Sequence, residues 1–166
     1  MNSPKKIHKI TGKILINNNL QKFEPDIIAE LVLEKITKLI SNFTNIEEEL
    51  FKKNKIEVKL IKIIAEEYFQ KDIFEIHFTI NKKGDLFLNN LLKEINTDEI
   101  LKTIDTRVDD NCNLFIRLDL NKFIEKDELL LTDSGNCIHL RIKIASYPSK
   151  KDKAIETIKT IINEIK

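Results

Sequence analysis

The amino-acid sequence predicts an α+β fold, in which helices pack on one face of a mainly antiparallel, mixed sheet of about six strands. Three observations predict this class. Several short segments alternate apolar and polar side chains, which is the period of a strand with one buried face. Other segments repeat apolar residues every three or four positions, as amphipathic helices do. Most of the strand-like segments follow one another as in a meander, which favours antiparallel pairing.

The first half of the chain predicts three strands and two helices. The strands are expected at residues 7–16, 56–64 and 73–80, with the last two as an antiparallel pair. Pro25 suits the first turn of a helix, and the apolar spacing carries that helix to Phe43. Thr44 and Glu47 have the spacing of a capping box for a short helix ending near Lys53.

The second half predicts three further helices and three further strands. The helices are expected at residues 85–95, 98–105 and 152–165, capped by Asp85, by Thr97 or Asp98, and by Ser149 with Asp152. The strands are expected at residues 114–120, 127–132 and 138–144. Gly135 between the last two is a hairpin signal, and Pro148 ends the final strand.

One domain over residues 1–166, with a frayed basic start at residues 1–6, is the simplest organisation. No linker, repeat or low-complexity tract divides the chain. The apolar runs are too short to span a membrane, and no signal-peptide pattern is visible. We therefore expect a soluble, cytoplasmic protein.

The chemistry of most enzyme classes is missing from the sequence. Only three glycines occur, far apart, so no phosphate-binding loop is present. Cys112 and Cys137 are isolated, which disfavours a disulfide scaffold or a zinc knuckle. A metal site of His8, His77 and His139 is disfavoured because His8 shares the parity of apolar residues. We expect no catalysis, no cofactor and no metal.

The strand CIHLRIKIASYP, residues 137–148, raises the question of function. Its apolar positions alternate with His139, Arg141 and Lys143, so one face of the sheet is cationic. The neighbouring strand adds Arg117, and Phe115 on the same parity can stack a base. The first strand contributes two further candidates if it lies nearby, Lys9 and Lys13.

Charge along the chain points the same way. Residues 1–22 carry a net charge of +5 and residues 141–166 carry +4, whereas residues 98–133 carry −5. If the two basic ends meet in the fold, they form a patch for an anionic partner.

The last third of the chain carries a more specific pattern. It reads NLFIRLDL from Asn113, then ELLLTDSG, then CIHLRIKIASYPSKKDKAIETIK. This ending resembles an archaeal family of RNA-binding proteins and predicted exosome subunits. The matching positions are Arg117, Leu118, Asp119, Ile138, Leu140, Arg141, Ile142, Lys143, Ile144, Tyr147 and Pro148.

The resemblance implies a fold like that of a large-subunit ribosomal protein, RNA and an RNA-processing complex as partners, a cytoplasmic location and no catalysis. Two places depart from the family pattern. Leu120 and Asn121 stand where the family has Lys-Gln, and EEYFQKDIF (residues 66–74) lacks the glycine of the family's loop. Contacts at these places do not carry over.

Two other interpretations of the cationic face stay open. The face can simply be solvated, with Glu75 and Asp119 neutralising the cations as cross-strand pairs. Alternatively, Phe115 and His77 bury against a second copy or a larger assembly, which makes the domain a protein-interaction module without RNA affinity.

Overall fold

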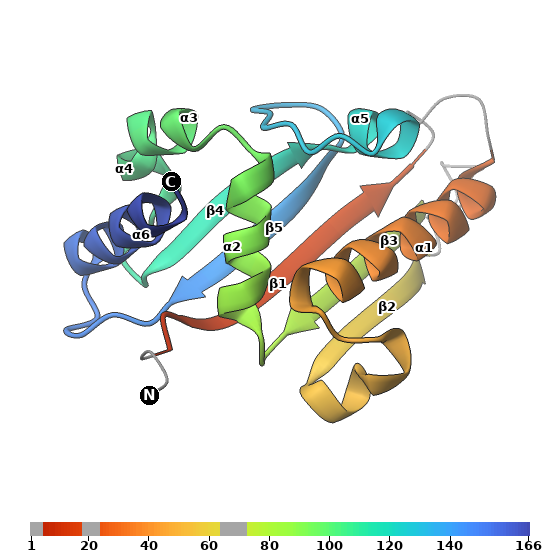
Figure 1. Cartoon of the computed structure of the whole chain (residues 1–166). Coiled ribbons are helices and arrows are strands. Elements are labelled where there is room, and N and C mark those ends of the chain that lie inside the picture. The colour runs from red at the N-terminus through yellow and green to blue at the C-terminus, as the bar shows by residue number, and fades with distance from the viewer. Residues whose placement is uncertain (1–4, 18–23, 64–72) are drawn as a thin grey trace.

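The computed structural model describes residues 5–17, 24–63 and 73–166, which form a sheet with helices on one side (Figure 1). The strands are β1 (Ile7–Ile16), β2 (Ile56–Ile63), β3 (Ile73–Ile80), β4 (Asn113–Asp119) and β5 (Cys137–Ile144). Their order is β2-β3-β1-β5-β4, and every neighbouring pair is antiparallel. The predicted α+β class and the β2–β3 pairing are confirmed.

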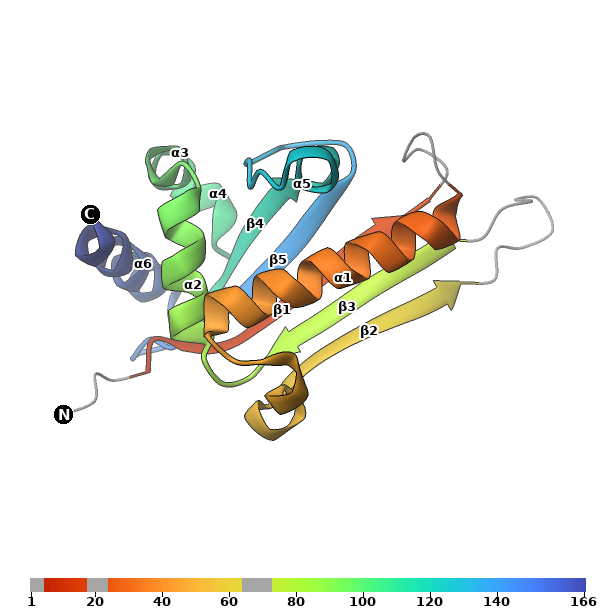
Figure 2. The ribbon, with the colours of Figure 1, turned by 45° about the vertical axis from the view of Figure 1, so that its right-hand side comes forward.

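The helices gather over one face of the sheet. They are α1 (Pro25–Thr44), α2 (Gly84–Glu94), α3 (Thr97–Lys102), α4 (Ile104–Arg107), α5 (Leu120–Lys126) and α6 (Lys151–Ile165), with 3-10 turns η1 (Glu48–Leu50) and η2 (Lys52–Asn54). Helix α1 lies over β3 and β2, α2 over β1, and α6 beside α2 and β5 (Figures 1 and 2). The opposite face of the sheet is left uncovered by these elements.

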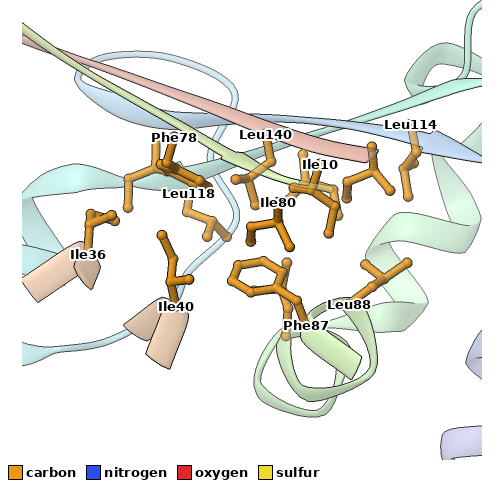
Figure 3. Packing of buried hydrophobic residues seen from close by; sticks show 14 of the residues in the cluster. Ile10, Ile36, Ile40, Phe78, Ile80, Phe87, Leu88, Leu114, Leu118 and Leu140 are labelled. Atoms are coloured by element: carbon orange, nitrogen blue, oxygen red, sulfur yellow. The ribbon is translucent and has the colours of Figure 1, made fainter. Parts of the chain in front are cut away.

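The core lies between the helices and the covered face of the sheet (Figure 3). Ile10 from β1 and Ile80 from β3 meet Ile40 from α1 and Phe87 from α2, and all four are buried. The Phe87 ring also meets Phe43 edge-on, with ring centroids 5.6 Å apart. Each strand buries alternate residues against the helices, so the other set of alternate residues must point to the open face.

The sheet has five strands rather than six among the described residues. Residues 127–132 were predicted to form a strand, but they make only an isolated bridge, between Leu131 and Leu118. Asp119 N donates to Leu130 O and Thr132 N to Arg117 O, so this segment lies along β4. Both edges of β5 are already paired, one with β1 and the other with β4. The segment therefore cannot form the predicted hairpin with β5.

The end of one predicted strand and the start of one predicted helix also differ from the structure. Leu120 begins α5 instead of ending a strand, because Asp119 accepts a hydrogen bond from Lys122 N and caps the helix. Thr44 does not cap a helix; its hydroxyl donates to Ile40 O inside α1, and two 3-10 turns follow.

The predicted caps of α2, α3 and α6 do not form, and of these helices only α3 is capped by the side chain of a neighbouring residue. Asn96 caps α3 in place of Thr97 or Asp98, and no side chain caps α6. Asp85 is not the cap of α2; its carboxylate accepts hydrogen bonds from the backbone N–H groups of Lys6 and Ile7. Lys6 also forms an ion pair with Glu164, so the beginning of β1 is held at three points. Of the expected frayed start, residues 1–4 lie outside the described part of the chain.

Candidate nucleic-acid interface

The open face of the sheet is built by residues of one parity from all five strands. A β-bulge between Ile7 and Lys9 changes the expected parity at the start of β1. Ile7 is buried, whereas Lys9 and also His8, which was expected to share the parity of the apolar residues, are exposed. From Lys9 onward the alternation holds, so Lys13 points away from the helices.

The register of the strands aligns five basic side chains across the sheet. Lys13 of β1 is the partner of His77 on β3 and of His139 on β5. His77 is in turn the partner of Lys59 on β2, and His139 that of Arg117 on β4. We call these five residues the basic row: Lys59, His77, Lys13, His139 and Arg117. The row runs at right angles to the strands and contains no carboxylate.

A second row lies next to the basic row, one step along the strands. Thr11 is paired with Thr79 on one side and with Arg141 on the other, and Arg141 is paired with Phe115 on edge strand β4. The bridge between Val108 and Leu114 brings the end of α4 alongside β4. Antiparallel geometry then places Arg107 beside Phe115. Phe115 is therefore flanked by Arg107 and Arg141.

The arginines of the face are not neutralised. Arg117 and Arg141 are exposed, and no carboxylate of the described residues lies within ion-pair distance of either side chain. Asp119, expected as a neutralising partner, caps α5 instead. The ammonium group of Lys143 donates a hydrogen bond to the carbonyl oxygen of Asn111. This bond holds the Lys143 side chain against the turn before β4.

Glu75 is the carboxylate that offsets part of the basic row. It lies 2.6 Å from His77 Nε2 and 3.4 Å from Lys13 Nζ. The hydrogen bond from His77 holds the pKa of Glu75 below its usual 4.5; burial opposes this, and Lys13 adds to it. Lys59 is likewise paired, with Glu57 at 2.6 Å. The acids that pair with the basic row thus lie on the β2–β3 side, whereas Asp119 and Asp133 near β4 form no ion pair with Arg117 or Arg141.

His139 is uncharged at neutral pH. Burial lowers its pKa below the usual 6.5, and the positive charges of Arg117 and Lys13 lower it further. Its Nε2 lies 3.0 Å from Cys137 Sγ. Burial is also the main reason why the pKa of the Cys137 thiol is raised above 9.0, so that sulfur stays protonated. An anion that binds at the row would therefore raise the pKa of His139.

The open face is hollowed along these two rows. A depression of about 1050 Å³ includes four members of the basic row, all except Lys59. It also includes Phe115 and Arg141 of the second row. Thr103, Thr106 and Arg107 line it from the side of α3 and α4, and Thr132 and Asp133 line it from the loop before β5. The depression is wide and open, as a site for an extended ligand is.

The residues named from the sequence come together only in part. Lys13, Phe115, Arg117, His139 and Arg141 line the depression. Lys9 and Lys143 pair with each other beyond its edge. Sequence reasoning missed Arg107 and Lys59 as members of this face. Lys59 alternates with apolar residues in its strand, which is a usable signal, whereas Arg107 has none.

Other kinds of site find no support in the described part of the chain. No group of three or more His, Cys, Asp or Glu side chains there could hold a metal ion. The carboxylate of Asp109 accepts hydrogen bonds from the N–H groups of Asn111 and Asn113 and shapes the turn before β4. None of the described helices has the length and apolar character that crossing a membrane requires.

Comparison with solved structures identifies relatives with the same fold. Protein AF2318 from Archaeglobus fulgidus is 23% identical with a TM-score of 0.65, covering 94% of this chain and 99% of that one. Mth689, a DUF54 protein from Methanothermobacter thermautotrophicus, is 22% identical with a TM-score of 0.64, covering 95% and 99%. SSO0741 from Sulfolobus solfataricus is 19% identical with a TM-score of 0.60, covering 94% and 98%.

A search among curated proteins finds no match. A protein-family model does match, over residues 32–144, and its description is RNA binding. The matched span begins inside α1 and ends with β5, so it includes four of the five strands of the open face. The chain belongs to this RNA-binding family.

Proposed function

We propose that this protein binds RNA, without catalysis, through the open face of its sheet. The observation that carries the proposal is the pair Arg117 and Arg141. Both are exposed on adjacent strands, and no described carboxylate pairs with them. Exposed arginine side chains without a carboxylate partner bind phosphate oxygens through charge-assisted hydrogen bonds. Release of counterions from the RNA supplies much of the affinity.

Sequence-tolerant binding fits this face best. Its charged groups are spread over several strands, as a surface that follows a phosphate backbone requires. A role as an accessory to RNA processing, or to the exosome, is the context in which such an activity is useful. That role stays a prediction from the resemblance of the chain's last third.

The test is the double variant Arg117→Ala/Arg141→Ala, measured by fluorescence anisotropy with labelled RNA over a range of salt concentrations. We expect the affinity to fall about tenfold or more, and the salt slope to become shallower by about 0.7 for each phosphate that the variant no longer neutralises. The matched control is Lys93→Ala/Lys159→Ala, which removes the same charge from exposed positions on α2 and α6. Equal affinity of the two double variants would refute the proposed surface.

A protein-interaction module is the second candidate, and one observation favours it. Leu15 and Ile61 lie on either side of Glu75 on the open face and are 42% and 41% exposed. Exposed aliphatic side chains suit burial against a second copy. Sizing in high and low salt distinguishes the two: a salt-resistant dimer without RNA affinity favours the module.

A further inference from the structure

We propose that the RNA bound here is single-stranded and crosses the sheet at right angles to the strands, with one unpaired base on Phe115 and its backbone along the basic row. This inference rests on the proposed RNA binding and goes further by naming the class of RNA and its path.

Phe115 points to an unpaired base. Its side chain is 40% exposed, and no other described ring contacts it. The ring lies next to Arg141 on β5 and next to Arg107 at the end of α4, whose Nε donates to Thr103, so it offers a stacking surface beside two guanidinium groups. In a duplex the bases are stacked on each other and cannot reach such a ring, so the arrangement selects single strands.

The basic row gives the direction. It crosses all five strands with one basic side chain from each, whereas the acids Glu75 and Glu57 stand one step off the row. A path along β5 would pass Lys143, whose ammonium group is held against the turn before β4 by its hydrogen bond to Asn111 O. The depression in the face also follows the row, because it reaches from β3 through β1 and β5 to β4.

The length of the row sets the length of RNA it can hold. Five neighbouring strands span about 19 Å, since adjacent strands are about 4.8 Å apart. At a rise of about 3.4 Å per nucleotide this distance holds about six stacked nucleotides, and fewer when the strand is extended. Lys59 at the far end, four strands from Arg117, is reached only by the longer oligonucleotides.

The experiment compares labelled oligouridylates of about 4 and 8 nucleotides with a blunt RNA duplex of about 12 base pairs. For Phe115→Leu, which keeps an apolar side chain, we expect affinity for the single strands to fall about tenfold and affinity for the duplex to stay unchanged. For Lys59→Ala we expect a loss of about threefold with the longer oligonucleotide and none with the shorter one. Lys9→Ala, which removes a cation displaced along β1 instead, is the matched control and should show no such length dependence.

Failure of this inference is distinguishable from failure of the proposed function. If the wild-type protein binds RNA but prefers the duplex, or if Phe115→Leu binds single strands as tightly as wild type, the single-strand assignment is wrong while RNA binding stands. A length-dependent loss for Lys9→Ala and not for Lys59→Ala would overturn the direction alone. No binding of any of the three RNAs by the wild-type protein, at about 50 mM salt, overturns both proposals.

Discussion

Phe78 of β3 lies over Gly12 of β1, its direct partner across the sheet. A Cβ atom on residue 12 would come within 1.9 Å of the Phe78 ring. The ring is buried on the helix-covered face, so it fills the place that a side chain of β1 would otherwise occupy. An aromatic side chain that covers a glycine in this way fixes the pairing of two strands. Lys13, next along β1, owes its alignment with His77 to that pairing.

Gly12→Ala should therefore destabilise the protein. The added methyl group forces the Phe78 ring to move within a packed core, which costs about 1–3 kcal/mol. Urea unfolding followed by circular dichroism measures the loss. Thr11→Ala is the control, because Thr11 points to the open face and its removal should change the free energy of unfolding by less than about 0.5 kcal/mol.

Asp85→Ala should destabilise the beginning of β1. Its carboxylate accepts the N–H groups of Lys6 and Ile7 at 3.1 and 2.8 Å, and no other carboxylate of the described chain replaces it there. Loss of an acceptor for these partly buried donors costs about 1–3 kcal/mol. Hydrogen exchange should show the amides of Lys6 and Ile7 losing protection first. Asp152→Ala, which removes an exposed acid from the first turn of α6, should cost less, about 0.3–1 kcal/mol, and should leave the exchange of Lys6 and Ile7 unchanged.

The sequence predicts much of the fold because most of its elements are strongly periodic. Residues 7–16 and 73–80 form strands with the predicted bounds, and the helix beginning at Pro25 is also where it was expected. The sixth strand was wrong for a tertiary reason. Residues 127–132 have suitable side chains, but the backbone of β5 is already paired on both sides.

The sequence predicts which side chains of each strand point to the open face. It does not predict which side chains of different strands lie next to one another. Parity alone places Arg117, His139 and Arg141 on the polar face. The basic row depends on strand order, which brings β1 between β3 and β5 although these are far apart in sequence. Arg107 joins through an isolated bridge of α4 to β4, which leaves no periodic signal. Long-range pairing of this kind cannot be inferred from local patterns.

Glu75→Gln should strengthen RNA binding. The change removes the carboxylate that offsets Lys13 and His77 and keeps the size of the side chain. With one negative charge fewer beside the basic row, we expect about a threefold to tenfold gain in affinity at low salt, shrinking as salt is added. Anisotropy titrations at two salt concentrations measure it.

The control for this gain is Glu156→Gln. It removes a carboxylate that pairs with Lys153 at 3.4 Å on α6, in the helix layer, and makes the same change in net charge. An equal gain for both variants would mean that net charge, and not the open face, governs RNA binding.

Glu75→Gln should also change the stability of the protein at acid pH. Because the folded pKa of Glu75 is lowered from 4.5, the wild type has stability that is present above pH 4.5 and lost as pH falls below it, and the variant lacks this part.

RNA affinity should rise as the pH falls, because of His139. In the unbound protein its pKa lies below 6.5, since burial and the charges of Arg117 and Lys13 disfavour the protonated ring. A phosphate seated on the row supplies the opposite charge and raises that pKa in the complex. Binding therefore takes up a proton: affinity increases as pH falls through the pKa of the complex and levels off below the pKa of the free protein.

Titrations between about pH 8 and pH 5.5 measure this uptake, with a limit of about tenfold per pH unit for one proton. The groups that face His139 are Lys13 from β1, Arg117 from β4 and the Cys137 thiol from its own strand, with Glu75 one residue pair beyond Lys13. His139→Gln should flatten the profile. His8→Gln, at the β-bulge of β1 and outside the basic row, is the matched control and should leave the slope of the profile unchanged. A profile that is equally steep in His139→Gln and in wild type would show that the phosphate does not lie on the row at His139.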